Sequence, residues 1–385
     1  MDFGLTAEQQ ALREEVRRFA ENEIEPVARE HDRAEQYPSD VMEEAVDMGL
    51  VGAHIPLEYG GAGYGPLEQA IIIEELFAVD PGIALCISAA AFGADAILEF
   101  GTDEQKERYL EPIPTGESVM GAAISEPDTG SDVSSVSTSA RLDGDEWVIN
   151  GRKMWITNGS VGDYFIVMCE TDPDIEDRYS GFSQIIVEAD RDGFSTEKIT
   201  GKLGIRASDT AELILDDVRV PEENLVGTRG LGFLQLMQFF DDTRTMVAAQ
   251  AVGIAEGACR QALAYAQERE QFGRPIAEFQ AIQHTLADMH TDTEAARQLA
   301  YESAWAIDHD EERLTRLASM AKEFASRVAV DVTDSAVQVH GGAGYVDDFA
   351  ASRFYRDAKI TQIYEGTTEI QKNIIARELL GKSLV

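Results

Sequence analysis

The stretch Glu146-Trp147-Val148-Ile149-Asn150-Gly151 decides the fold class, because it places a β-strand in the middle of a chain whose two ends have helical patterns. Its aromatic and β-branched residues are typical of strands. Asn-Gly is a strong signal for a two-residue hairpin turn, so we expect a hairpin at Asn150-Gly151. Runs of similar composition at 164–169, 184–187 and 211–215 predict further strands. The middle of the chain is therefore predicted to be mostly β.

Helical periodicity predicts the segments on both sides of this region. Thr6 and Gln9 have the spacing of a capping box and begin a helix. On the N-terminal side we expect further helices at 39–50, 66–79, 84–100 and 103–110; on the C-terminal side, long helices at 233–269, 276–309, 311–339 and 368–380. The prediction is an α+β chain of three domains: α-helical over 1–120, β over 121–225 and helical over 226–385.

Charge and hydropathy exclude several classes of partner. The 385 residues include 71 acidic and 32 basic ones, a net charge of −39 that repels phosphate backbones and anionic lipids. Only eight of the basic residues are lysines, and many carboxylates with few lysines are typical of salt-adapted (halophilic) proteins. No segment approaches the roughly 20 apolar residues of a membrane span, and the first residues do not resemble a signal peptide. We expect a cytoplasmic protein with no membrane insertion and no nucleic-acid partner.

Several other candidate sites are weak. Cys86, Cys169 and Cys259 lie far apart with no CxxC pair, which favours small core residues over a disulfide or a zinc site. His284 and His290 are six residues apart on a predicted helix and point to different faces, so no metal is expected there. Turns, and not phosphate-binding loops, are the simpler interpretation of the glycine-rich segments at 60–65, 227–232 and 341–344.

Residues 363–371, with the sequence IYEGTTEIQ, hold the strongest catalytic candidate. Glu365 is followed by a helix whose start is marked by Thr368 and Gln371 at capping-box spacing. A carboxylate among these apolar neighbours would be partly desolvated, which raises its pKa toward that of a general base. From the spacing alone, an acid that only helps to cap its helix is the simpler alternative.

Three stretches read together change that balance: 123–132 (AISEPDTGSD), 154–159 (MWITNG) and 363–371. Together they resemble the signature stretches of the acyl-CoA dehydrogenases. The resemblance spans nearly the whole chain and continues, in family order, through 59–61 (YGG), 202–206 (KLGIR), 241–244 (DDTR), 269–273 (REQFG) and 338–342 (QVHGG). It implies an N-terminal α-helical domain, a central β domain and a C-terminal four-helix bundle, in agreement with the pattern above.

The resemblance also implies FAD, bound in a site shared between subunits of a homo-oligomer that is usually a homotetramer. Residues that match the family's flavin-ring and ribityl contacts are Ile124, Ser125, Gly130, Ser131, Trp155 and Thr157. Those that match the pyrophosphate and adenine side, from a neighbouring subunit, are Arg269, Phe272, Gln280, Gln338, Gly341 and Gly342. Thr367 and Glu369 would complete that side from the first subunit.

The chemistry that the resemblance implies is α,β-dehydrogenation of an acyl-CoA to a trans-2-enoyl-CoA, as in fatty-acid β-oxidation. Glu365 would take the α proton while the β hydride goes to flavin N5, and electron-transferring flavoprotein would accept the electrons. Substrate-side positions are Ser131, Asp241, Thr243, Arg244 and Gly366. Glu at 365 together with Thr at 243 favours the short- or medium-chain, or short-branched, type. Arg244 could equally form an ordinary ion pair within its helix.

Three rival functions use a similar scaffold. Acyl-CoA oxidases are usually much longer than 385 residues. A glutaryl-type decarboxylating dehydrogenase needs a buried arginine for the distal carboxylate, and the sequence assigns no residue to that role. A non-catalytic flavin protein that binds nucleic acid needs a basic face, which a net charge of −39 disfavours.

Overall fold

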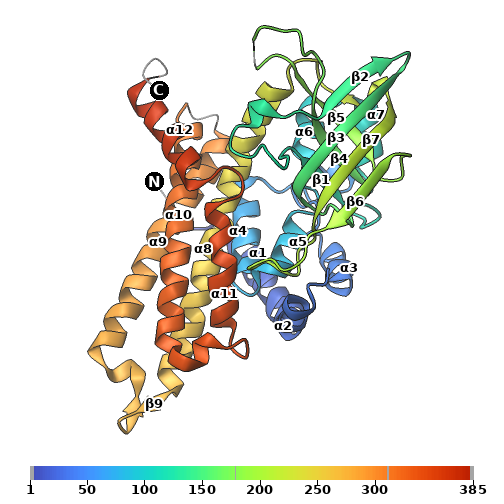
Figure 1. The fold of residues 1–385 in the computed structure, drawn as a ribbon. Helices are drawn as coiled ribbons and strands as arrows, with labels where there is room; N and C mark the ends of the chain where they lie inside the picture. Colours follow the sequence, from blue (N-terminus) through green and yellow to red (C-terminus); the bar gives the residue numbers. More distant parts are fainter. Residues whose placement is uncertain (1–3, 178, 310–311, 382–385) are drawn as a thin grey trace.

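The computed structural model describes residues 4–177, 179–309 and 312–381, and its N-terminal part is helical (Figure 1). Thr6 caps the first helix as expected: its hydroxyl accepts from the N–H of Gln9, whose side chain accepts from the N–H of Thr6. The helices of this part are α1 (Ala7–Phe19), α2 (Glu25–Ala34), α3 (Ser39–Asp47), α4 (Pro66–Phe77), α5 (Pro81–Ser88), α6 (Ala94–Phe100) and α7 (Asp103–Leu110), with a π-helical turn, Ala20–Ile24, between α1 and α2.

The single helix expected over 84–100 is wrong, because the chain forms α5 and α6 there. The Asp80 carboxylate caps α5 by accepting from the N–H of Ile83 at 2.8 Å. Gly93, with φ 111°, then reverses the chain before α6. A left-handed glycine between two apolar segments ends one helix and begins another, which apolar periodicity alone does not reveal.

An eight-stranded sheet follows, in the order β6-β7-β3-β2-β4-β5-β8, with β1 paired in parallel to β4. Trp147, Phe165 and Leu213 are among the side chains that fill its own apolar core. The strands are β1 (Met120–Ala123), β2 (Ser139–Asp143), β3 (Glu146–Thr157), β4 (Tyr164–Glu170), β5 (Phe182–Glu188), β6 (Phe194–Lys198), β7 (Thr210–Pro221) and β8 (Leu225–Val226).

The hairpin expected at Asn150-Gly151 is also wrong, because β3 continues through this pair to Thr157. The register against β7 shifts there, so Asn-Gly forms a β-bulge. The side-chain amide of Asn150 forms hydrogen bonds across the sheet and not within a turn. It donates to the carboxylate of Asp217 and accepts from the N–H of Asp217, both at 2.9 Å. The hairpin turn lies at Gly144, between β2 and β3.

A bundle of long helices completes the chain, and Figure 1 shows α1, α4 and α5 between this bundle and the sheet. A Cβ at Gly253 would lie 2.4 Å from the carbonyl oxygen of Glu74, so glycine allows α8 to pack closely against α4. The helices are α8 (Gly232–Glu268), α9 (Gln280–Asp308), α10 (Leu314–His340), α11 (Ala350–Ala358) and α12 (Thr368–Leu380). The expected start of α10 at residue 311 lies outside the described residues.

The predicted order of helical, β and helical regions is confirmed. Cys86 and Cys169 are buried and Cys259 is partly exposed, all three as free thiols. Among the helices of the described residues, none combines the length and the apolar character needed to cross a bilayer.

Candidate active site

Glu365 lies in a tight turn between the short helical segment η7 (Lys359–Gln362) and α12. Its φ is 52° and that of Gly366 is 88°, so two successive residues adopt the left-handed conformation. For a residue with a Cβ this conformation costs about 1 kcal/mol or more, and surrounding contacts have to hold it. Such strain is concentrated at functional sites, which favours a functional role for Glu365 over one limited to capping a helix.

The cap predicted at Thr368 is wrong by one residue. Thr367 is the N-cap of α12, and its hydroxyl accepts from the N–H of Ile370 at 3.4 Å. Gln371 does not take part in the cap, because its side-chain amide donates to the carbonyl oxygens of Glu365, at 3.1 Å, and of Gly366, at 3.0 Å.

Two residues of α8 approach the Glu365 turn. The Thr243 hydroxyl donates to Oε2 of Glu365 at 2.9 Å. Arg244 is buried and donates from Nη1 to Oδ1 of Asp241 at 2.7 Å, so the helix ion pair considered above is present. The same guanidinium also acts electrostatically on Glu365. The predicted residues Asp241, Thr243, Arg244 and Gly366 therefore meet around this carboxylate.

Lys322 of α10 is a site residue that the sequence reasoning missed. Its side chain is 1% exposed, and Nζ donates to the carbonyl oxygen of Tyr364 at 2.6 Å and to that of Gly366. The available signal was a single lysine in a helix face of small residues, between Ala318 and Ala325. Lysine is almost never fully buried without partners, so this pattern predicts a buried acceptor.

The surroundings raise the pKa of Glu365 above the ordinary carboxyl value. Burial is the main cause, because it disfavours the charged form. The hydrogen bond from Thr243 and the positive charges of Lys322 and Arg244 offset part of that effect. Burial also lowers the pKa of Lys322 to about 7. A carboxylate with a raised pKa is a stronger base than an exposed one, which suits a general base.

The predicted flavin-side residues lie along one part of the sheet. Trp155 has φ 65° and is 62% exposed, at a register shift in β3 that turns the indole out of the core. The N–H of Met154 donates to the carbonyl of Ser125 at 2.9 Å, which joins the segment after β1 to β3 beside Trp155. The predicted residues Ile124, Ser125, Gly130, Ser131, Trp155 and Thr157 are all carried by β3 or by the segment that follows β1.

A buried ion pair fixes this segment. Lys153 donates from Nζ to Oε1 of Glu126 at 2.9 Å and to the carbonyl of Ile124 at 3.0 Å, and neither charged side chain is more than 5% exposed. Oε2 of Glu126 accepts from the N–H and the hydroxyl of Ser137, both at 2.7 Å. Although burial opposes ionisation, the Lys153 charge and these hydrogen bonds lower the pKa of Glu126 to about 2.

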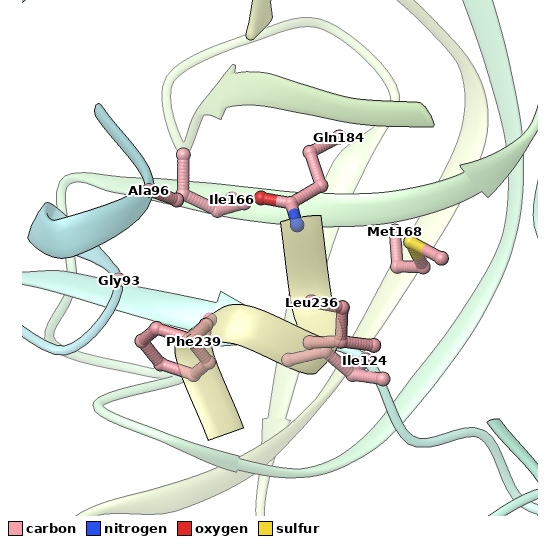
Figure 2. A pocket seen from close by; sticks show the side chains of 9 residues that line it. Gly93, Ala96, Ile124, Ile166, Met168, Gln184, Leu236 and Phe239 are labelled. Atoms are coloured by element: carbon pink, nitrogen blue, oxygen red, sulfur yellow. The ribbon is translucent and has the colours of Figure 1, made fainter. Parts of the chain in front are cut away.

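A small apolar pocket lies where the sheet meets the start of α8 (Figure 2). Ile124 lines it from the sheet side and Leu236 from α8, so the pocket walls link the segment after β1 to the helix that carries Thr243. Gln184 is its polar side chain and donates to the carbonyl of Gly232 at 3.3 Å. The remaining lining residues are Gly93, Ala96, Ala122, Ile166, Met168 and Phe239. Glu365 does not line this pocket, which is therefore distinct from the turn that holds it.

The residues predicted for the pyrophosphate and adenine side lie far from Glu365 in the same chain. Arg269 ends α8, twenty-six residues beyond Thr243, which at 1.5 Å per residue is about 40 Å. Phe272, with φ 55°, is 93% exposed in the hairpin between α8 and α9. Gln280, Gln338, Gly341 and Gly342 are likewise exposed, at the start of α9 and the end of α10. One chain therefore does not bring this set to Glu365.

Comparison with known families decides the identity of this arrangement. The profile of the acyl-CoA dehydrogenase N-terminal domain matches residues 6–117, that of the middle domain matches 121–218 and that of the C-terminal domain matches 230–380. The chain belongs to the acyl-CoA dehydrogenase family. The family resemblance derived from the sequence motifs is thus confirmed, and with it the fold class and the assignment as an oxidoreductase. Acyl-CoA dehydrogenases generally bind FAD.

Relatives cover essentially the whole of this acyl-CoA dehydrogenase. A short-chain specific acyl-CoA dehydrogenase of Clostridium acetobutylicum is 44% identical over 380 residues, which are 98% of this chain and 100% of that protein. Butyryl-CoA dehydrogenase from Megasphaera elsdenii has a TM-score of 0.94 at 39% identity, over 99% of this chain and 100% of that one. A chain in the structure described as the electron transferring flavoprotein of Acidaminococcus fermentans has a TM-score of 0.95 at 44% identity, over 99% and 100% of the two chains.

One group of side chains in this acyl-CoA dehydrogenase has the composition of a metal site. Donor atoms of Glu256, His290 and Glu294 lie within 4.8 Å of one another. Arg297 already pairs with both carboxylates, at 2.9 Å from Glu256, and Arg260 pairs with Glu256 at 2.8 Å, so guanidinium groups take the place that a cation would need. The sequence reasoning compared His290 only with His284 and missed this group, because Glu256 comes from another helix.

Proposed function

We propose that this chain catalyses FAD-dependent α,β-dehydrogenation of a short- or medium-chain, or short-branched, acyl-CoA to the trans-2-enoyl-CoA, with Glu365 as the catalytic base. The observation that carries the proposal is the hydrogen bond from Thr243 to a Glu365 carboxylate that is held in a left-handed turn. A base has to point at one C–H bond. The backbone turn and the hydrogen bond from Thr243 together fix the direction of the Glu365 side chain.

Two groups of Glu365 have separate roles in the proposed reaction. Among the described residues, the main-chain N–H of Glu365 has no hydrogen-bond partner, so it can donate to the thioester carbonyl of the substrate. This donation stabilises the negative charge that develops on the oxygen as the α proton leaves. The carboxylate takes that proton, and its raised pKa makes it a stronger base than an exposed glutamate.

The residues along β3 and the segment after β1 fit a flavin. A large indole that stays 62% exposed at Trp155, next to the Met154 N–H that donates to the main-chain carbonyl of Ser125, offers a flat apolar face beside the segment after β1. When bound, FAD accepts the hydride from the β carbon. The adenine side would be held by Thr367 and Glu369 of the same chain and, from a neighbouring subunit of a homotetramer, by the exposed set Arg269, Phe272, Gln280, Gln338, Gly341 and Gly342.

The space beside the base favours a short acyl chain. Gln250 lies two turns along α8 from Thr243 and so on the same helix face. Its side-chain oxygen accepts from the hydroxyl of Tyr364, the residue before Glu365. This polar pair joins α8 to the residue before the base, and an acyl tail that passed between the two side chains would have to break their hydrogen bond. The likeness to butyryl-CoA dehydrogenase points in the same direction.

The glutaryl-type alternative has less support, because its distal carboxylate needs a buried arginine. Arg244 acts electrostatically on Glu365, but it is already paired with Asp241 at 2.7 Å. For the electron acceptor we propose electron-transferring flavoprotein, a choice supported by the likeness to a chain from a structure of that name.

The decisive experiment is a turnover profile of the flavin-loaded protein with a dye acceptor and saturated acyl-CoAs of four to sixteen carbons, with glutaryl-CoA and CO2 detection in parallel. We expect turnover that is greatest with short chains. Glu365→Gln should bind acyl-CoA yet fail to bleach the flavin, with a rate at least about 100-fold lower. The exposed acid Glu43 on α3 provides the matched control, Glu43→Gln. Release of CO2 from glutaryl-CoA, or bleaching by Glu365→Gln at the normal rate, would refute the proposal.

A further inference from the structure

We infer that Lys322 is the positioning residue of the base: its side chain locks the Glu365 turn from behind and aims both the carboxylate and the main-chain N–H of Glu365 toward the substrate. The inference rests on the proposed function, in which those two groups perform the reaction.

The first argument is the direction of the peptide groups. All three carbonyl oxygens of the turn are tied to side chains: Nζ of Lys322 binds those of Tyr364 and Gly366, and Gln371 binds those of Glu365 and Gly366. The C=O of Tyr364 and the N–H of Glu365 belong to one trans peptide plane and point in opposite directions. Anchoring this carbonyl to α10 therefore turns the N–H of Glu365 away from α10, where it remains without a partner among the described residues.

The second argument is strain. Glu365 and Gly366 both have positive φ, a conformation that is sterically unfavourable for Glu365 because it has a Cβ. A lysine ammonium has three N–H donors, so a single group can hold the carbonyls on both sides of Glu365 at once. Apolar side chains can fill the same space but cannot bind these oxygens. The hydrogen bonds of Lys322 to the two carbonyls offset the cost of burying its ammonium group, and the same bonds keep the turn in place.

The third argument is charge. The positive groups that act on the Glu365 carboxylate are Lys322 from α10 and Arg244 from α8, and the Arg244 charge also acts on Lys322. From α12, Lys372 is directed to the surface, where it pairs with Glu323 at 3.5 Å. Removing the Lys322 charge therefore removes one of two cations that favour the ionised base, and the pKa of Glu365 rises.

The test compares three variants of the flavin-loaded enzyme. In Lys322→Met we expect kcat to fall by about 10- to 100-fold while KM stays within about threefold, because the base is misaimed but the CoA contacts remain. The acid limb of its kcat profile should move to higher pH. Gln371→Leu should lower kcat about tenfold without moving the acid limb, because it removes two donors but no charge. Lys372→Met, the exposed control, should match the unchanged enzyme.

The outcomes separate this inference from the proposed function. If the unchanged enzyme turns over no acyl-CoA, the proposed function is wrong. If it is active and Lys322→Met keeps both its kcat and its acid limb, the inference about Lys322 is wrong. If Lys322→Met has a lower melting temperature but an unmoved acid limb, Lys322 contributes to stability alone, and the inference is also wrong. If Lys322→Met does not fold with flavin, Gln371→Leu decides, since an unchanged kcat there shows that the turn needs no anchor.

Discussion

The Thr243 hydroxyl donates a hydrogen bond of 2.9 Å to Oε2 of Glu365, and this contact joins two segments that are 122 residues apart in the sequence. It connects the first helix of the bundle to the turn before the last one. The position and ionisation of the base therefore depend on how α8 and α12 are packed, and not only on the residues that adjoin Glu365.

Removal of this hydroxyl should shift the pH dependence of turnover. Burial already raises the pKa of Glu365, so activity is lost as the pH falls through that raised value. In Thr243→Val the charged carboxylate loses a donor worth about 1.5–3 kcal/mol, so the acid limb of kcat should move up by about one pH unit or more. Dye-reduction rates between pH 5 and 9 measure the shift. Thr243→Ser keeps the donor and should keep the limb; a Val variant that titrates like the unchanged enzyme would show that the bond is unimportant.

Removing one partner of the buried pair of Lys153 and Glu126 should destabilise the sheet. Lys153→Met leaves a buried carboxylate without its cation, and the free energy of unfolding should fall by about 3–5 kcal/mol. The double variant Lys153→Met/Glu126→Gln removes the unpaired charge and should recover part of the loss. Urea unfolding at pH 7 measures both, and a single variant as stable as the parent would contradict the prediction.

The same pair predicts an acid transition. Because the pKa of Glu126 is lowered to about 2 in the folded state, its stabilisation is complete above the unfolded carboxyl pKa of about 4.3 and is lost as the pH falls from there toward 2. The difference in stability between the parent and Lys153→Met/Glu126→Gln should accordingly shrink between about pH 4 and pH 2, and a constant difference across that range would count against the pair.

The pair of Gln250 and Tyr364 should set the preferred chain length. Gln250→Ala removes the amide that binds the Tyr364 hydroxyl and leaves more space there, so the maximum of kcat/KM should move by about two carbons toward longer chains. A series of acyl-CoAs from four to twelve carbons measures the shift. Gln10→Ala on the exposed face of α1 is the control, and an unchanged maximum in Gln250→Ala would place the end of the acyl pocket elsewhere.

The net charge of −39 predicts salt activation. At low ionic strength the carboxylates repel one another and also repel polyanionic CoA, whereas in 1 M salt the screening length falls to about 3 Å. Both the melting temperature and kcat/KM should rise from 0.05 to 2 M KCl. Activity that declines steadily over this range would exclude a salt-adapted surface.

The fold was largely predictable because long helices and apolar strands carry strong periodic signals. The errors in predicting individual turns and helix ends arose where a residue type is common in two different local structures. Asn150-Gly151 was expected to turn the chain, but Asn150 bonds across the sheet to Asp217 and the pair forms a bulge. The break before Gly93 was missed because both flanking segments are apolar and helical.

The candidate site was only partly predictable for a different reason. Glu365 and Thr243 came from the family motifs, whereas Lys322 and Gln371 act through bonds to main-chain carbonyls. A carbonyl oxygen is present in every residue and leaves no trace in the sequence. The partners of such a side chain are known only when the backbone path, here the left-handed turn at Glu365, is known.

The length of α8 has a genetic consequence. About 40 Å separate Thr243 from Arg269, so in the proposed homo-oligomer the two ends of this helix would serve different copies of the proposed flavin site. Consider a mixed dimer in which one subunit is altered at Glu365 and the other at Phe272. One of its two sites would contain both defects, and the second site would contain neither. Co-expression of the two alleles would thus rescue function that neither supports by itself.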